Sequence, residues 1–158
     1  MTRTTALPEV RIRRVAAADR DAWLRMRYAL WPAERGEHGH ERDVDEFFAG
    51  RSRSLDAVLV AAASGLGAIG FLELRVRNYA EGSHGHAVPH VEGWYVEAEH
   101  RRQRIGARLL AAAERWARAA GYAELASDAA IDNAASNAAH RALGFEITDR
   151  IVCFLKKL

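Results

Sequence analysis

Apolar and polar residues alternate along several short stretches of the 158-residue chain, and this period of two predicts β-strands. Val10 and Ile12 alternate with arginines, which indicates a first strand. Two apolar runs, 57–63 and 68–76, are separated by a turn that contains serine and glycine, so they predict an antiparallel hairpin. The same reasoning predicts further strands over 90–96, 122–127 and 147–155.

A different spacing, with apolar residues every three or four positions, predicts helices. Trp23, Met26 and Leu30 follow it, and Asp19 is placed to cap the helix that they define. Pro32 ends this helix near Leu30, because the residue before a proline is pushed out of the helical region. The other predicted helices are 43–50, 103–120 and 134–143, closed by Gly50, Gly121 and Gly144, and the predicted loops include 33–40 and 78–87.

The predicted elements follow the order β-α-α-β-β-β-α-β-α-β. This order is mixed rather than strictly alternating, which disfavours a doubly wound parallel sheet. With 49% hydrophobic residues, the chain is expected to form a single domain over 1–158. We therefore predict an α/β (α+β) fold, in which helices flank a mixed central sheet.

Charge and hydropathy exclude several classes of partner. The chain has 23 Lys and Arg against 21 Asp and Glu, and no block of like charge forms a tail for nucleic acid. No apolar run approaches the ~18 residues of a membrane span, and the N-terminus lacks the apolar region of a signal peptide. We expect a soluble, cytoplasmic protein that binds neither nucleic acid nor membrane.

Cysteine and histidine usage predicts no metal site. Cys153 is the single cysteine, which excludes an internal disulfide and a multi-cysteine zinc site, and it is expected to be a small apolar strand residue rather than a nucleophile. Four histidines fall in glycine-containing stretches without the spacing of metal ligands, and we expect them to be solvated loop residues: His38, His40, His84 and His86.

The segment 91–110 carries the first candidate chemistry. A strand runs into a basic turn, and the turn opens the most regular helix of the chain. Free backbone N–H groups and the positive end of the helix dipole suit a pyrophosphate at such a place. The alternative is a solvated basic turn that merely begins a helix, and the residues alone weigh the two equally.

Two carboxylates form the second candidate. Glu92 lies in an otherwise apolar strand, and Asp128 follows the next one. A carboxylate can take the proton that an ammonium must lose before it attacks a thioester. Alternatively, Glu92 faces solvent and Asp128 caps a helix, and the residues alone favour this second interpretation.

The basic turn, taken with the order of elements, resembles the GNAT acetyltransferase family. That family's pyrophosphate loop reads Gln/Arg-x-x-Gly-x-Gly/Ala, and this chain has Arg101-Arg102-Gln103-Arg104-Ile105-Gly106-Ala107. By this match Arg101 heads the loop, Gly106 is its last small residue and Arg104 replaces its first glycine. The resemblance implies a GNAT fold and acetyl-CoA as cosubstrate.

Longer stretches resemble the aminoglycoside 6′-N-acetyltransferases of the chromosomal Acinetobacter-like subgroup. The most specific is Ser127-Asp128-Ala129-Ala130-Ile131-Asp132-Asn133. The others are Val91-Glu92-Gly93-Trp94-Tyr95-Val96, His140-Arg141-Ala142-Leu143-Gly144-Phe145 and the C-terminal Phe154-Leu155-Lys156-Lys157. The resemblance covers nearly the whole chain.

This resemblance implies roles on the acceptor side of the site. Glu92 and Asp128 would contact the aminoglycoside, with Asp128 the first choice for the base and Glu92 an amine-binding partner that shares the work. By the same matching, Trp31, Tyr79 and Asp149 look like substrate-binding positions. The alternative from their sequence context alone is that Trp31 and Tyr79 are ordinary packing aromatics and that Asp149 is an exposed acid at a strand end.

The resemblance also implies the cofactor contacts. Backbone groups of Trp94, Tyr95 and Val96 would face the pantetheine, and the pyrophosphate would lie on Arg102, Gln103, Arg104, Ile105, Gly106 and Ala107. Asn133 stands at a cofactor-contacting position. His140 falls where many relatives have a tyrosine that protonates the departing thiolate, a role that histidine can also fill. From its position alone, an ordinary histidine on the helix surface is an equally good interpretation.

The resulting hypothesis is direct acetyl transfer from acetyl-CoA to the 6′-amino group of an aminoglycoside, conferring resistance, in a homodimer. Two alternatives remain: a GNAT enzyme for another amine, such as a polyamine or a protein α-amine, and a non-catalytic module that binds acyl-CoA.

Overall fold

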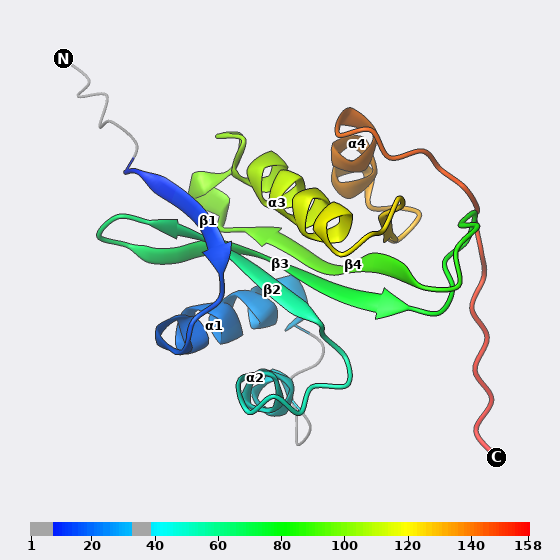
Figure 1. Cartoon of the computed structure of the whole chain (residues 1–158), viewed down its shortest axis with the longest axis horizontal. Coiled ribbons are helices and arrows are strands. Elements are labelled where there is room, and N and C mark those ends of the chain that lie inside the picture. Colours follow the sequence, from blue (N-terminus) through cyan, green and yellow to red (C-terminus); the bar gives the residue numbers. More distant parts are fainter. Residues whose placement is uncertain (1–7, 33–38) are drawn as a thin grey trace.

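The computed structural model describes residues 8–32 and 39–158, and its centre is a five-stranded sheet in the order β1-β2-β3-β4-β5 (Figure 1). The first four strands pair antiparallel with their neighbours, and β5 runs parallel to β4. The strands are β1 (Val10–Arg14), β2 (Ala57–Ala63), β3 (Gly67–Arg77), β4 (Val88–Val96) and β5 (Ala126–Ser127).

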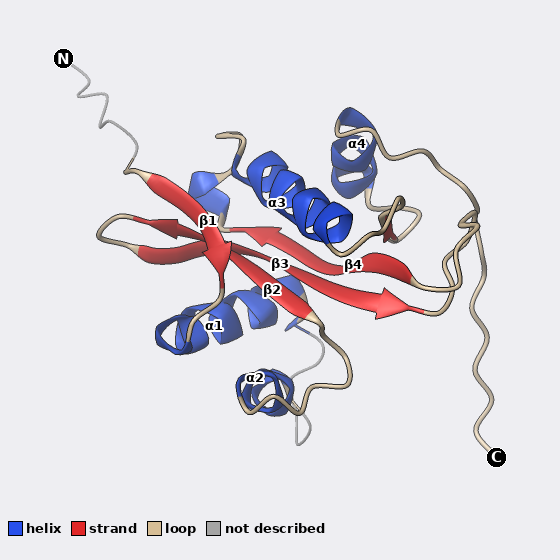
Figure 2. Cartoon of the chain, in the orientation of Figure 1, coloured by secondary structure: helices blue, strands red, loops and turns tan. Residues whose placement is uncertain are grey.

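Helices cover both faces of this sheet, as Figure 2 shows. The helices are α1 (Arg20–Leu30) and α2 (His40–Phe48) on one face, and α3 (Ile105–Ala119) and α4 (Ala134–Ala142) on the other. The α1 face buries Trp23, Met26 and Phe71, whereas the α3 face buries Leu72 and Leu109. The predicted mixed sheet flanked by helices is therefore confirmed.

Most of the predicted elements appear close to their expected bounds. Asp19 does occupy the N-cap position of α1, but its buried carboxylate accepts from the backbone N–H of Ala16 and pairs with Arg13 instead of capping the helix. The histidine prediction was wrong for His40, which is the buried first residue of α2. The predicted loop 33–40 and His38 lie largely or wholly outside the described residues.

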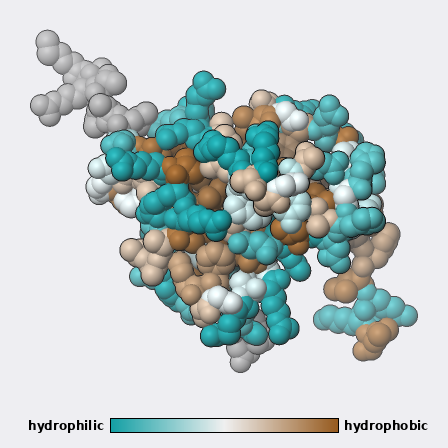
Figure 3. Space-filling view, viewed as in Figure 1, coloured by the Kyte–Doolittle hydropathy of each residue, from teal (hydrophilic) through white to brown (hydrophobic). Residues whose placement is uncertain are grey.

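The prediction of a C-terminal strand over 147–155 was wrong, because these residues form neither helix nor strand. They extend away from the body as an exposed segment with apolar and polar side chains side by side (Figure 3). The alternation that predicted a strand is present, but within the described chain no neighbouring strand pairs with it. Its exposed apolar residues are Ile147, Ile151, Val152, Phe154, Leu155 and Leu158.

A β-bulge interrupts the pairing of β3 with β4. Glu73 pairs with Gly93 and Leu74 pairs with Val91, so Glu92 is an extra residue on β4. A bulge bends its strand and redirects the side chains next to it. The bulge is therefore at Glu92, one of the two carboxylates that the sequence analysis identifies as candidates.

None of the helices in the two described ranges has the length and apolar character that crossing a membrane requires.

Candidate active site

The turn before α3 is built from two arginines in the left-handed region. Arg102 has φ 60° and Arg104, the N-cap residue of α3, has φ 61°. This backbone path lets the helix begin at Ile105 with its first N–H groups free. Arg104 therefore adopts the conformation that a glycine would adopt without steric cost.

A groove of about 330 Å³ lies between this turn, β4 and α4. Most of the predicted cofactor residues line it, namely Trp94, Tyr95, Val96, Arg102, Arg104, Ile105, Gly106 and Ala107. Two others do not: the Gln103 amide donates to the Glu99 carbonyl at 3.4 Å, and the Asn133 side chain caps α4 by accepting from Ser136 N.

Trp94 joins the strand side of the groove to the turn. Its indole N–H donates to the Gly106 carbonyl at 3.2 Å. A Cβ at Gly106 would lie 3.3 Å from the same ring, so residue 106 has little room for a side chain. A compact turn with free N–H groups and several guanidinium groups suits a pyrophosphate.

His140 on α4 stands between this groove and a second, larger cavity. Its Nδ1 lies 2.7 Å from the Ser136 carbonyl and its Nε2 lies 2.8 Å from the Ser127 hydroxyl. A carbonyl only accepts, so in the neutral ring Nδ1 donates and Nε2 accepts from Ser127. The ring also packs edge-on against Trp94, with the centroids 5.4 Å apart. These contacts place His140 at the inner border of the groove.

The second cavity measures about 540 Å³ and lies beside the end of β5. Asp128, Asp149, His140 and His90 line it together with the carboxylates of Glu81 and Glu146. Arg141 and Arg150 also line it, so the four carboxylates leave a net acidic wall, which can hold a ligand with several amino groups. Tyr79 is 65% exposed and, like Trp31 and Glu92, does not line this cavity.

Glu92 and Asp128 meet in one charged cluster with Arg77 and His90. Arg77 binds Glu92 through two hydrogen bonds of 2.7 Å and lies 3.7 Å from Asp128. His90 lies 3.6 Å from Glu92 and 3.4 Å from Asp128. The solvated-strand interpretation of Glu92 was therefore wrong, and Asn133, not Asp128, caps the following helix.

The cluster sets the charge state of its members. The His90 imidazole holds the pKa of the Asp128 carboxyl below its ordinary value, and Arg77 adds to this effect while partial burial opposes it. The hydrogen bonds to Glu92 raise the pKa of Arg77. Asp128 thus presents an ionised carboxylate to the cavity.

Two members of this cluster, Arg77 and His90, are absent from the sequence predictions. Arg77 precedes Glu92 by 15 residues and gives no signal in the sequence. His90 does give a signal in the sequence. It precedes Glu92 by two positions in the same predicted strand, and residues two apart in a strand lie on the same face.

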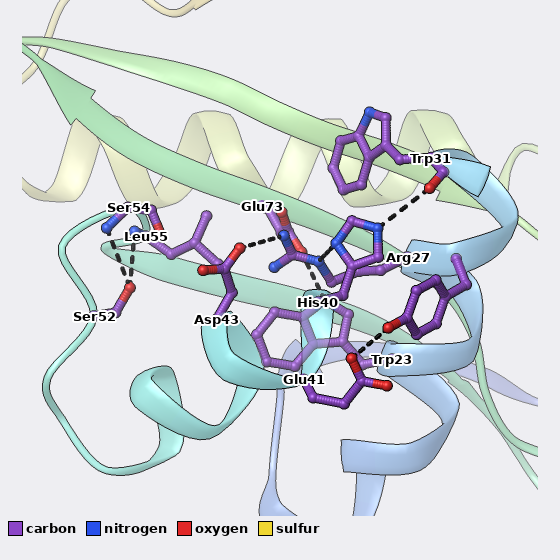
Figure 4. Close-up of polar contacts among 11 residues, drawn as sticks. Trp23, Arg27, Trp31, His40, Glu41, Asp43, Ser52, Ser54, Leu55 and Glu73 are labelled. Carbon is purple, nitrogen blue, oxygen red and sulfur yellow. Dashed lines mark hydrogen bonds and ion pairs between the residues drawn. The ribbon is translucent and has the colours of Figure 1, made fainter. Parts of the chain in front are cut away.

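Trp31 contacts the buried polar network that Figure 4 shows. Its carbonyl lies 3.3 Å from His40 Nε2, and its ring lies over the Arg27 guanidinium at 5.4 Å. Arg27 in turn lies 3.3 Å from Glu73, which accepts from the Trp23 indole at 2.7 Å. Burial raises the pKa of Glu73 to about 7, although the Arg27 charge opposes the shift.

The Trp31 ring packs directly against β4. A Cβ at Gly93 would lie 2.6 Å from it, so only glycine fits the position that follows the bulge. Trp31 is therefore fixed beside the strand that carries Glu92.

Comparisons with known proteins point in one direction. Residues 23–145 match the acetyltransferase (GNAT) family. An aminoglycoside N(6′)-acetyltransferase type 1 of Klebsiella aerogenes is 42% identical over 147 residues, which cover 93% of this chain and 96% of that protein. A second, of Acinetobacter haemolyticus, is 37% identical over 137 residues, covering 86% and 90%.

Solved structures agree with the sequence comparisons. AAC(6′)-Iy in complex with the bisubstrate analogue CoA-S-monomethyl-acetylneamine superimposes with a TM-score of 0.84 at 32% identity, covering 95% of this chain and 99% of that one. The apo aminoglycoside 6′-N-acetyltransferase AAC(6′)-IG of Acinetobacter haemolyticus gives 0.81 at 36% identity, covering 94% and 99%.

Proposed function

The chain belongs to the GNAT acetyltransferase family, and on that premise we propose that it transfers the acetyl group of acetyl-CoA to the 6′-amino group of an aminoglycoside. Its relatives at 33–42% identity are named for this activity. The observation that carries the proposal is the acidic cavity beside Asp128, which adjoins the groove at the start of α3 through His140. Such an arrangement brings a polycationic amine and a thioester together in one complex.

Acetyl-CoA fits the groove on the α3 side. Its pyrophosphate would lie on the N–H groups at the start of α3, beside Arg102 and Arg104, and its pantetheine along the backbone of Trp94, Tyr95 and Val96. Gln103 and Asn133 remain proposed contacts at the edges of this site. A backbone N–H of β4 directed at the thioester oxygen would stabilise the tetrahedral oxyanion.

The acceptor would lose its proton to Asp128. The amine nitrogen then attacks the thioester carbon, the C–S bond breaks, and the thiolate takes a proton from His140 in its protonated form. Asp128 is the better candidate for the base because it faces the cavity, whereas Arg77 occupies both oxygens of Glu92. Glu92 stays the proposed amine-binding partner from the edge of the site, because each of its oxygens keeps a second lone pair beside the one that Arg77 takes.

Three further residues extend the acceptor site. Asp149 lines the cavity from the C-terminal segment and would bind an amino group of the aminoglycoside. Trp31, rigidly held against Gly93, and Tyr79, exposed beyond the end of β3, would pack against its sugar rings.

The C-terminal segment supports a homodimer. Apolar side chains on it are exposed to solvent, and β5 leaves one edge of the sheet open. Exposed apolar surface of this kind marks a contact with another chain. A second copy of this chain would cover the segment, and we place the dimer in the cytoplasm, where acetyl-CoA is available.

Release of CoA thiol across a panel of amines tests this function. Kanamycin- and tobramycin-type aminoglycosides should give turnover, and polyamines and peptides with a free α-amine should give little. Preferred turnover of a polyamine or a peptide would contradict the proposed acceptor. Tight CoA binding without turnover on any amine would instead support a non-catalytic acyl-CoA-binding module.

A further inference from the structure

His90 lies between the two carboxylates of the site. Its side chain is 3% exposed, Nε2 is 3.4 Å from an Asp128 oxygen, and Nδ1 is 3.6 Å from a Glu92 oxygen. The two ring nitrogens point in different directions, so a single imidazole connects residues 36 positions apart in the chain. His90 also forms part of the wall of the acceptor cavity.

The two carboxylates are held by different groups. Glu92 is bound by the two hydrogen bonds from Arg77. For Asp128 the neighbouring imidazole is the main reason that the pKa of the carboxyl lies below its ordinary value. His90 therefore keeps Asp128 ionised, the form that accepts a proton.

We propose that His90 is a positioning residue for Asp128: its Nε2–H donates to the carboxylate and holds it at the wall of the acceptor cavity. This inference rests on the proposed acetyl transfer. In the step, one N–H bond of the ammonium breaks and Asp128 takes the proton. The products are a neutral amine and a neutral Asp128 carboxyl group, while His90 keeps its own proton.

The contacts of the ring decide which nitrogen carries its proton. An ionised carboxylate only accepts, so the nitrogen 3.4 Å from Asp128 is the donor, Nε2–H. In the neutral ring Nδ1 is then an acceptor, and in the described chain it is buried and has no hydrogen-bond partner.

Other charged groups surround the pair of His90 and Asp128. Arg77 on β3 forms an ion pair with Glu92. Arg75 is the cross-strand partner of His90, and Glu81 lines the same cavity. His140 acts on Asp128 from the α4 side.

The first test is the pH profile of kcat for wild type, His90→Phe and the control His86→Phe, which changes an exposed loop histidine. Wild type and control should share one profile. His90→Phe should lose about tenfold or more in kcat with an unchanged Kd for CoA, and the acidic limb of its profile should move to higher pH, because the imidazole that lowers the pKa of Asp128 is gone. An unchanged pH profile in His90→Phe overturns the proposal, even if kcat is lower.

A second measurement needs no turnover. Carbon-13 NMR of the aspartate carboxyl carbons follows the titration of Asp128 in wild type and in His90→Phe. The midpoint of Asp128 should lie at higher pH in the variant, because the carboxylate loses the imidazole that stabilises its charge. Equal midpoints overturn the inference, whereas a wild-type enzyme that releases no CoA with any aminoglycoside overturns the proposed function instead.

Discussion

Asp128 and Glu92 have the same chemical group but different surroundings. Asp128 faces the acceptor cavity with three quarters of its side chain exposed, whereas Glu92 is bound to Arg77. We therefore expect Asp128→Asn to lower kcat by roughly 100-fold or more, the scale of a lost general base, and to leave the Kd for CoA unchanged. Glu92→Gln should mainly raise KM for the aminoglycoside.

Steady-state kinetics with both variants check this division of roles. A kcat loss confined to Glu92→Gln, with Asp128→Asn near wild type, would reverse the assignment.

Glu73 allows a prediction about pH and stability. Its pKa is raised by burial from an ordinary 4.5 to about 7, so the folded protein binds a proton more readily than the unfolded chain does. The stabilisation from this proton is present below about 4.5 and is lost as the pH rises through about 7. The free energy of unfolding of wild type relative to Glu73→Gln should fall over this interval.

Urea denaturation of both proteins at about pH 4.5 and about pH 7.5 measures that difference. A difference that stays constant or grows with pH would show that Glu73 does not bind a proton more readily in the folded protein than in the unfolded chain.

Single residues were predictable where a motif or a strand pattern marks them. Asp128 and Glu92 were found in this way, and the structure brings them together. Arg77 was not, because its place beside Glu92 depends on strand pairing and on the bulge in β4. The buried Arg27–Glu73 pair joins a helix to a strand 46 residues away, a contact that no local pattern reveals.

The turn before α3 is the element in which this chain departs from the family loop. The backbone of Arg104 is in the left-handed region, a conformation that costs most residues about 1–2 kcal/mol. We expect Arg104→Gly to be more stable than Arg104→Ala by about 1 kcal/mol, because only glycine adopts this conformation freely. Both variants lose the guanidinium, so both should bind CoA more weakly than wild type.

Chemical denaturation and calorimetric titration with CoA separate these two effects. Equal stability of the glycine and alanine variants would contradict the assigned backbone conformation.

Elements with their own apolar pattern were predicted well, as α3 and the β2–β3 hairpin show. The pattern over 147–155 is equally regular, yet these residues do not form a strand within the chain. A strand needs a partner for its backbone hydrogen bonds, and the sequence pattern does not say whether one is present. The short β5 differs from the predicted 122–127 for the same reason.

At the scale of the molecule, the exposed C-terminal segment determines the expected assembly. Replacing Ile151, Phe154 and Leu155 with serine removes the apolar side chains that would be buried by a second copy. Light scattering after size-exclusion chromatography should show a wild-type dimer and a monomeric variant. The control Leu66→Ser changes an exposed leucine in the β2–β3 turn and should remain dimeric.

A monomeric wild type, or a triple variant that stays dimeric, would show that the C-terminal segment does not form a dimer interface.

The acetylated position on the acceptor tests the central claim most directly. The measurement compares CoA release from two aminoglycosides that differ only in a 6′-amino or a 6′-hydroxyl group, and locates the acetyl group on the product by NMR. We predict rapid turnover of the 6′-amino compound, acetylation at that nitrogen, and little turnover of the 6′-hydroxyl compound. Equal turnover of both, or an acetyl group on another amine, would contradict the proposed function.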